Sequence, residues 1–244
     1  MILVTGLTKK YGKITAVDNL SFEINDGEVV GFLGPNGAGK TTTMNMICGY
    51  ISSTDGTVLI DGHDILKEPK EAKKCIGYLP EHPPLYTDME VLEYLSFVYD
   101  LKRVKDNKKV HLNEIMDRVG LTDVKNRLIK NLSKGYQQRV GFAQALVGNP
   151  KVLILDEPTV GLDPNQIIEI RKLIEDLGKE HTVILSSHIL AEIGAVCSKI
   201  IIINKGKIVA VDETNSLLLK TDSKDLEQAF TKLTAKEDTN ESNI

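Results

Sequence analysis

The stretch at residues 34–41, Gly-Pro-Asn-Gly-Ala-Gly-Lys-Thr, constrains the fold of this chain more than any other. It fits the pattern G-x-x-x-x-G-K-[ST] at every fixed position. The apolar run at residues 28–33 predicts a buried strand before it, and residues 40–48 predict the start of a helix after it. When a strand, a glycine-rich loop and a helix follow one another, the backbone N–H groups of the loop and the positive end of the helix dipole point at the same place and can bind an anion there. A glycine-rich turn without a ligand is the less favoured alternative, because a strand and a helix flank the loop.

This phosphate loop predicts roles for two side chains. Lys40 would reach the β- and γ-phosphates of a nucleotide, and the hydroxyl of Thr41 would hold Mg²⁺. The loop alone leaves kinase, GTPase, motor and transporter open, so the other motifs must decide between them.

The composition is that of an ordinary globular protein of 244 residues, enough for one large domain or two small ones. With 34 acidic against 30 basic side chains and no basic tract, no nucleic-acid partner is expected. No apolar run approaches the roughly 18 to 20 residues that span a bilayer. The first residues predict a strand rather than a signal peptide, so we expect a cytoplasmic protein. Three cysteines are expected to be reduced and packed in a core: Cys48, Cys75 and Cys197.

The first part of the chain predicts an antiparallel β layer. The alternation of Leu20, Phe22 and Ile24 is typical of a half-buried strand, and residues 2–5 predict another. Further strands are predicted at residues 57–60 and 75–80, followed by a loop at 81–86. Tyr11 precedes a turn, where it would be either a packing residue or a flat surface for an adenine ring. Its local context alone favours packing.

Between residues 88 and 148 strand signals stop and apolar residues recur at helical spacing, which predicts a helical insert. The insert contains Asn-Leu-Ser-Lys-Gly-Tyr-Gln-Gln-Arg at residues 131–139. Ser133 is placed to cap the following helix, so an ordinary capped helix is one interpretation. Gly135 in the first turn argues against it, because glycine costs a helix about 1 kcal/mol relative to alanine. It indicates close approach of the backbone to another group.

Two adjacent carboxylates, Asp156 and Glu157, follow the apolar strand predicted at residues 151–155. In a phosphate-loop protein, the first would order Mg²⁺ and the second would polarise the attacking water. The alternative is a solvated strand end. His188 directly follows the strand predicted at residues 182–186, at the sheet edge where ligands bind. The other histidines have no partner at metal spacing and are expected at the surface or in loops: His63, His82, His111 and His181.

Together these motifs resemble those of the nucleotide-binding subunit of ATP-binding cassette (ABC) transporters, over nearly all of the chain. Residues 132–137 resemble the family signature, which no other phosphate-loop class uses, and residues 161–163 resemble its D-loop. The resemblance implies an α/β P-loop NTPase: a RecA-like core with a mostly parallel sheet, an antiparallel β subdomain and an inserted helical subdomain. We expect the ATPase domain at residues 1–220, with core and β layer at about 1–87 and 149–220 and the insert at about 88–148.

The resemblance also implies the site, with ATP and Mg²⁺ as cofactors. The expected catalytic residues are Glu157, His188 and Glu81, and the expected Mg²⁺ residues are Thr41, Asp156 and Glu81. The expected nucleotide-binding residues are Tyr11, Asn36, Gly37, Ala38, Gly39, Lys40, Thr41, Thr42, Ser133 and Gly135.

Three positions depart from the usual family pattern. Lys134 and Tyr136 stand where the signature usually has glycine and glutamine, and Glu81 stands where the family usually has glutamine. Glu81 would either join the Mg²⁺ environment or turn outward into solvent.

Residues 77–81 and 226–234 are similar to single-domain ATPases of ABC-2-type exporters. In the tail at 221–244, Leu226, Phe230 and Leu233 form one apolar helical stripe, and the residues from 235 on are expected to be disordered. The resemblance implies two such subunits, identical or paired, that sandwich ATP between the phosphate loop of one and the signature of the other. It also implies integral-membrane permease subunits and a peripheral position on the cytoplasmic face of the cell membrane.

Other functions fit the sequence less well. A small GTPase would need an Asn-Lys-x-Asp motif, and residues 204–207 lack the aspartate. An ABC ATPase acting on a cytosolic machine would normally carry a second cassette or a long coiled-coil insert. A binding module without hydrolysis is disfavoured because Lys40, Asp156, Glu157 and His188 are all present.

Overall fold

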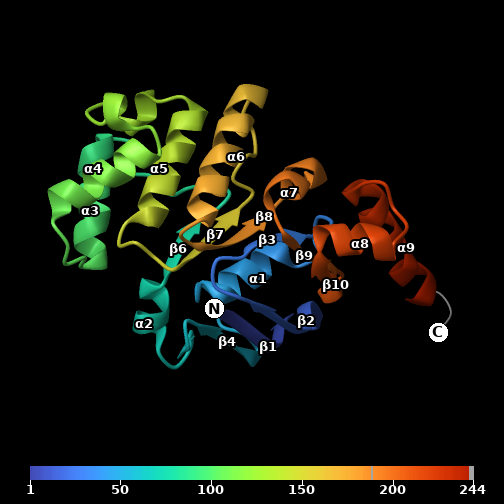
Figure 1. Cartoon of the computed structure of the whole chain (residues 1–244). Coiled ribbons are helices and arrows are strands. Elements are labelled where there is room, and N and C mark those ends of the chain that lie inside the picture. The colour runs from blue at the N-terminus through green and yellow to red at the C-terminus, as the bar shows by residue number, and fades with distance from the viewer. Residues whose placement is uncertain (188, 242–244) are drawn as a thin grey trace.

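Apolar runs and alternating apolar residues build two sheets in this chain (Figure 1). The computed structural model describes residues 1–187 and 189–241, with side chains up to residue 235. The larger sheet has the strand order β10-β9-β3-β8-β7-β6. Its strands β9, β3, β8, β7 and β6 are parallel to one another, and β10 is antiparallel to β9. Its strands are β3 (Val29–Leu33), β6 (Ile76–Leu79), β7 (Val152–Asp156), β8 (Thr182–Ser186), β9 (Lys199–Asn204) and β10 (Lys207–Glu213).

The smaller sheet is antiparallel, with the order β2-β1-β4-β5. Helix α1 (Lys40–Ile47) lies between the two sheets (Figure 1), and its Met44, Met46 and Ile47 are buried in the core that it shares with them. Helix α2 (Pro69–Lys74) follows this sheet in the chain. The strands are β1 (Ile2–Tyr11), β2 (Ile14–Ile24), β4 (Asp55–Ile60) and β5 (His63–Asp64).

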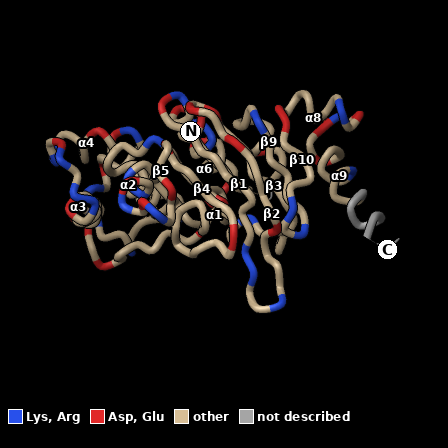
Figure 2. The backbone as a smooth tube through the Cα atoms, turned by 90° about the horizontal axis from the view of Figure 1, so that it is seen from below, with Lys and Arg blue, Asp and Glu red and all other residues tan. Residues whose placement is uncertain are grey.

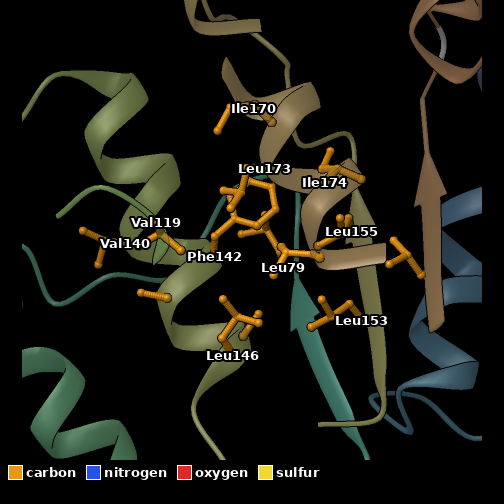
Figure 3. Close-up of a cluster of buried hydrophobic side chains, with 14 of the residues drawn as sticks. Leu79, Val119, Val140, Phe142, Leu146, Leu153, Leu155, Ile170, Leu173 and Ile174 are labelled. Atoms are coloured by element: carbon orange, nitrogen blue, oxygen red, sulfur yellow. The ribbon is translucent and has the colours of Figure 1, made fainter. Parts of the chain in front are cut away.

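Side chains alternate between two cores along the inner strands, because successive residues of a strand point to opposite faces. In β7, Val152 and Ile154 belong to the core around α1, whereas Leu153 and Leu155 belong to the core on the other face. Figure 3 shows this second core, where Phe142 of the insert packs with Leu79 of β6 and Leu155. The larger sheet is therefore covered on both faces, as its near-continuous apolar strands require.

Helices cover the second face of the sheet. Those of the insert are α3 (Val91–Lys102), α4 (Lys108–Arg118) and α5 (Lys134–Leu146), with short 3-10 turns at Thr122–Val124 and Ile129–Asn131. They are followed by α6 (Pro164–Gly178) and α7 (Leu190–Val196). The predicted P-loop NTPase architecture, with a β layer and a helical insert, is confirmed. The division into domains at particular residues stays a prediction.

The end of the chain forms two more helices, α8 (Thr214–Lys220) and α9 (Leu226–Glu241). The predicted apolar stripe faces the protein: Leu226 is buried, and Phe230 and Leu233 pack against the second core. The predicted disorder of the last residues stays a prediction, and residues 242–244 lie outside the described part of the chain.

Two histidines that we expected at the surface or in loops have structural roles. His181 is buried, and its Nδ1 lies 2.7 Å from the carbonyl oxygen of Pro150, so burial lowers the pKa of its imidazole. His181 lies in the loop between α6 and β8, which was one of the two expected places, but its burial was not predicted because its tertiary partner is not visible from local composition. His111 is partly buried, and its Nε2 accepts a hydrogen bond from the N–H of Gly148 at 3.0 Å.

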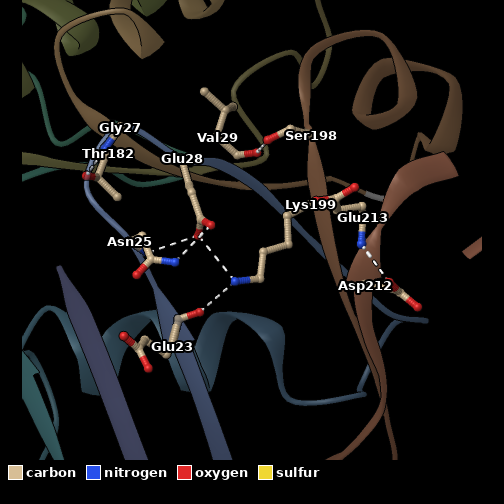
Figure 4. Close-up of polar contacts among 10 residues, drawn as sticks. All are labelled: Glu23, Asn25, Gly27, Glu28, Val29, Thr182, Ser198, Lys199, Asp212 and Glu213. Atoms are coloured by element: carbon tan, nitrogen blue, oxygen red, sulfur yellow. Dashed lines mark hydrogen bonds and ion pairs between the residues drawn. The ribbon is translucent and has the colours of Figure 1, made fainter. Parts of the chain in front are cut away.

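Polar contacts fasten the amino ends of the central strands (Figure 4). Nζ of Lys199 lies 3.2 Å from Oε2 of Glu28 and donates to the carbonyl of Glu23 at 2.9 Å. The N–H of Gly27 donates to Oγ1 of Thr182 at 3.0 Å. The opposite, carboxyl ends of these strands carry the candidate site.

The distribution of charges, the helices and the cysteines agree with what the composition predicts. Acidic and basic residues are interspersed along the backbone rather than gathered on one element (Figure 2). In the described part of the chain, no helix is long and apolar enough to cross a membrane. All three cysteines are free; Cys48 and Cys197 are buried, and Cys75 is partly exposed.

Candidate nucleotide-binding site

The phosphate loop connects β3 to α1 and depends on glycine at specific positions. Gly37 and Gly39 have φ of 82° and 102°, in the left-handed region that favours glycine. A Cβ on Gly39 would lie 2.6 Å from the carbonyl oxygen of Ala16, and one on Gly34 would lie 2.5 Å from that of Ile203. The loop is therefore held closely between β2 and β9, and only glycine fits at these contacts.

The structure places the predicted loop residues on a short arc before α1. Asn36 and Gly37 are exposed, Ala38 is buried, and Thr42 is partly buried on α1. The side chain of Lys40 turns back into the loop. Its Nζ donates to the carbonyl oxygen of Gly34 at 2.7 Å and lies 3.4 Å from that of Pro35. An ammonium group therefore occupies the centre of the arc, where the phosphates would bind.

Asp156, at the carboxyl end of β7, lies next to this loop. It is 2% exposed and accepts a hydrogen bond from the hydroxyl of Ser186. Burial raises the pKa of the Asp156 carboxyl, and the charges of Glu157 and Glu81 raise it further, while the Ser186 hydrogen bond and the nearby Thr41 hydroxyl act in the opposite direction. A buried carboxylate that is costly to ionise attracts a cation. Thr41 and Asp156 thus offer the oxygen ligands that Mg²⁺ prefers.

Glu157 is held in an uncommon backbone conformation. Its φ is 49°, in the left-handed region, and its side chain is buried. Its N–H donates to the carbonyl oxygen of Ser186 at 3.1 Å, and Ser186 pairs with Asp156 in the register of β7 and β8. Such strain persists where surrounding contacts enforce it, and it is frequent at functional sites. Ser186 was not predicted as a site residue, because its position at the end of a predicted strand was its one sequence signal.

Glu81 follows β6 and is exposed, with its Oε1 3.8 Å from Nδ1 of His82. Its charge is the smallest of the causes that shift the pKa of Asp156, in the raising direction. A place for Glu81 among the Mg²⁺ residues therefore stays a prediction. His188 lies outside the described residues, and its role stays a prediction.

The remaining predicted residues lie apart from the phosphate loop. Tyr11 ends β1 with its ring exposed, and Nζ of Lys9 lies 5.1 Å from the ring centroid. Ser133 caps α5, as predicted, by accepting a hydrogen bond from the N–H of Tyr136 at 3.4 Å. Gly135 is buried, and a Cβ there would lie 2.7 Å from the side chain of Gln166 on α6. Helix α5 packs in the second core, on the opposite face of the sheet from α1.

Comparison with known proteins decides the family. Residues 17–160 match the family described as ABC transporter. The chain belongs to this family. Its fold and its class as an ABC-type ATP-binding and ATP-hydrolysing transport subunit, both predicted from the sequence, are thereby confirmed.

Relatives and solved structures agree with this assignment. The chain is 42% identical over 211 residues to the bacitracin transport ATP-binding protein BcrA of Bacillus licheniformis, covering 86% of this chain and 68% of the relative. It is 36% identical over 231 residues to the lantibiotic transport ATP-binding protein SrtF of Streptococcus pyogenes, covering 94% and 96%. The structure of an ATP-binding subunit of an ABC transporter superposes with a TM-score of 0.87 at 26% identity, covering 96% of this chain and 99% of that one. A dimeric ATP-binding cassette in a post-hydrolysis state with ADP and Pi gives 0.78 at 28% identity, covering 87% and 98%.

Proposed function

We propose that this chain is the ATPase of an exporter and drives transport by closing around ATP as a dimer. The observation that supports this proposal most strongly is the position of Lys40 inside the glycine arc, at the sheet edge where the buried Asp156 ends β7. Relatives support export: BcrA is a bacitracin transport ATP-binding protein, and another relative, of Bacillus subtilis, is a linearmycin resistance ATP-binding protein. The cargo would be selected by the membrane subunits.

The residues present fit Mg²⁺ as well as ATP. Thr41 and Asp156 would hold the ion, with Glu81 in its surroundings, and the bound ion would offset the charge that develops on the phosphates. The pKa of Asp156, raised by burial, supports a cation there in the working protein. Each of these side chains lies at the carboxyl edge of the parallel sheet, where ligands of open α/β sheets bind.

Each side chain has a step in the proposed mechanism. Nζ of Lys40 would leave the carbonyl of Gly34 and donate to the β- and γ-phosphates. Glu157 would accept a proton from the attacking water, and its strained backbone would fix the direction of its carboxylate. The ring of Tyr11 would stack on adenine once Lys9 moves from its face, and His188 would contact the γ-phosphate.

The signature of one chain would complete the site of its partner. Ser133 and Gly135 lie at the start of α5, which packs on the opposite face of the sheet from the phosphate loop. A helix N-terminus favours an anion, and here it is available to a second molecule rather than to the chain's own loop. The dimeric cassette with ADP and Pi supports such an arrangement.

The proposed contact with membrane subunits lies on the insert and on the loop just before it. Tyr86, Phe97 and Leu101 are exposed there, and Tyr86 stacks edge-on with Tyr94 and Phe97 at centroid distances of 6.1 and 5.5 Å. Tyr94 also donates to Gln144, which borders a cavity of about 340 Å³ beside the exposed Tyr50. Exposed apolar side chains that gather on one surface are typical of a protein interface. This surface would bring the chain to the cytoplasmic face of the membrane.

The test of the proposed function is the variant Glu157→Gln. It should retain MgATP binding and lose at least ~10²-fold in hydrolysis rate, the order expected for a positioned base. Purified wild-type protein provides the reference rate, and nucleotide binding is measured by fluorescence titration. Near-normal turnover in Glu157→Gln would remove Glu157 from this role.

A further inference from the structure

A buried polar cluster joins three elements behind the site. Oγ1 of Thr159 donates to Oε2 of Glu192 at 2.5 Å, and the guanidinium of Arg171 approaches Oε1 of Glu192 at 3.9 Å. Thr159 and Glu192 are each 3% exposed. Thr159 lies in the loop between β7 and α6, Arg171 lies on α6, and Glu192 lies on α7.

This cluster is placed to control the loop that carries Glu157. Thr159 is two residues beyond Glu157, and the N–H of Val160 donates back to the carbonyl of Glu157 at 3.2 Å. The N–H of Leu162 donates to the carbonyl of Thr159 at 3.2 Å, so the same turn continues into the segment at 161–163. The Thr159 hydroxyl is the side-chain link from this turn to α7.

Helix α7 is a firm anchor for that link. Ile193, next to Glu192, packs so closely on β3 that a Cβ at Gly31 would lie 2.4 Å from its side chain. β3 leads directly into the phosphate loop. Glu192 therefore connects the turn after Glu157 to β3: it accepts the Thr159 hydrogen bond, and its helix α7 packs on β3, which leads to Lys40.

Stability alone gives little reason for such a cluster. The buried Glu192 carboxylate is costly to desolvate, and the Arg171 side chain beside it is 30% exposed, so their ion pair at 3.9 Å adds little to stability. The contacts are also incomplete: among the described residues, Nε of Arg171 is buried and has no hydrogen-bond partner. An incomplete buried polar network is expected where its groups serve a function rather than stability.

We propose that Glu192 is a positioning residue for hydrolysis, which holds Glu157 in its left-handed conformation through the hydroxyl of Thr159. Arg171 keeps the Glu192 carboxylate turned toward Thr159. The proposal rests on the function proposed for Glu157. It assigns no contact between Glu192 and nucleotide, so loss of the link should change the rate of hydrolysis and leave ATP binding nearly intact.

The experiment compares two threonine-to-valine changes. Thr159→Val removes the link without changing side-chain shape, and Thr182→Val is the matched control. The hydroxyl of Thr182 is also buried and accepts a hydrogen bond, but at the amino end of β8 (Figure 4). We expect Thr159→Val to lower kcat by about 10-fold or more, as small misplacements of catalytic groups do, with KM for ATP changed less than about 2-fold. Thr159→Ser should restore most of kcat, and Thr182→Val should leave kcat near the wild-type value.

Other outcomes overturn the proposal. A Thr159→Val protein with wild-type kcat would show that the link does not position Glu157. The same conclusion would follow if Thr159→Val and Thr182→Val lost kcat equally and their Tm values fell by the same amount. If Thr159→Val does not fold, Glu192→Met replaces it, because methionine has a similar volume and offers no oxygen to accept the Thr159 hydrogen bond, and the same changes in kcat and KM are expected. Glu157→Gln is measured in parallel: if it hydrolyses ATP normally, the proposed function fails, whereas a dead Glu157→Gln beside a normal Thr159→Val rejects the link alone.

Discussion

At the scale of residues, the site contains side chains that would bind nucleotide or Mg²⁺ but whose burial lowers the stability of the folded protein. Asp156 is the clearest case, because burial is the largest cause of its raised pKa. The folded protein holds the proton of this carboxyl more tightly than the unfolded chain does. The ionised carboxylate therefore lowers the free energy of unfolding at neutral pH, and this cost disappears as the pH falls below the ordinary pKa of 3.8.

Replacing Asp156 with Asn should therefore raise Tm in the absence of nucleotide at about pH 7, with a difference that narrows toward about pH 4. Asn can still accept the hydrogen bond from Ser186. Asp64→Asn is the control of opposite sign: burial raises the pKa of Asp64, but backbone N–H donors from Leu66 and Lys67 lower it overall. Calorimetry across this pH range checks both, and a lower Tm for Asp156→Asn at neutral pH would contradict the account.

The charge of Glu81 contributes to the raised pKa of Asp156. Glu81→Gln should improve ATP binding without metal relative to MgATP binding. It should also raise the Mg²⁺ concentration for half-maximal hydrolysis by about 3- to 10-fold, because one nearby charge is removed. Glu68→Gln is the matched control, since Glu68 is also an exposed glutamate paired with a histidine, His63, at 3.3 Å. Superimposable Mg²⁺ titrations of Glu81→Gln and wild type would place Glu81 outside the site.

At the scale of elements, the helical insert docks on the sheet through glycine. A Cβ at Gly77 of β6 would lie 2.3 Å from the carbonyl oxygen of Ala145 near the end of α5. On α5, a Cβ at Gly141 would lie 2.6 Å from the side chain of Leu79. Glycine on both elements lets the insert approach the strand that leads to Glu81.

Gly77→Ala should separate α5 from β6 and destabilise the protein by about 1–3 kcal/mol, the usual cost of overpacking. The obstructing atom is a backbone oxygen, which cannot turn away. Gly194→Ala on α7 is the control, because its Cβ would meet only the flexible side chain of Leu226 at 3.0 Å, and its effect should stay within about 1 kcal/mol. Urea unfolding measures both. Equal stabilities for the two variants would show that the approach of α5 to β6 is not limited by Gly77.

Elements were more predictable from the sequence than contacts. The strands at 151–155 and 182–186 were evident because both are continuous apolar runs, and the phosphate loop because its glycines, lysine and threonine stand in fixed order. Ser186 was missed because its partner Asp156 is 30 residues away and only the β7–β8 register brings them together. The burial of His181 and the link of Thr159 to Glu192 were missed for the same reason, since tertiary packing decides them.

At the scale of the whole molecule, we predict that the surface proposed to contact the membrane subunits can be disrupted without loss of ATP hydrolysis. Leu101→Asp should leave ATP hydrolysis by the isolated chain unchanged and weaken co-purification with membrane subunits from detergent-solubilised membranes by about 10-fold, the effect of a residue worth over 1 kcal/mol. Leu219→Asp is closely matched, because both leucines are exposed and each is the penultimate residue of its helix, α3 and α8. Equal recovery of the membrane subunit with both variants would move the interface elsewhere.

The central claim is that each active site is shared between two chains. Lys40→Ala damages the phosphate loop and Ser133→Arg damages the signature, so each variant alone should be inactive. In a mixed dimer, one site would combine the intact loop of one chain with the intact signature of the other, and the second site would carry both defects. ATP hydrolysis by the mixture, measured with the heterodimer isolated through two affinity tags, should recover to a substantial fraction of the wild-type rate. A proven heterodimer that remains as inactive as its parents would contradict the shared site.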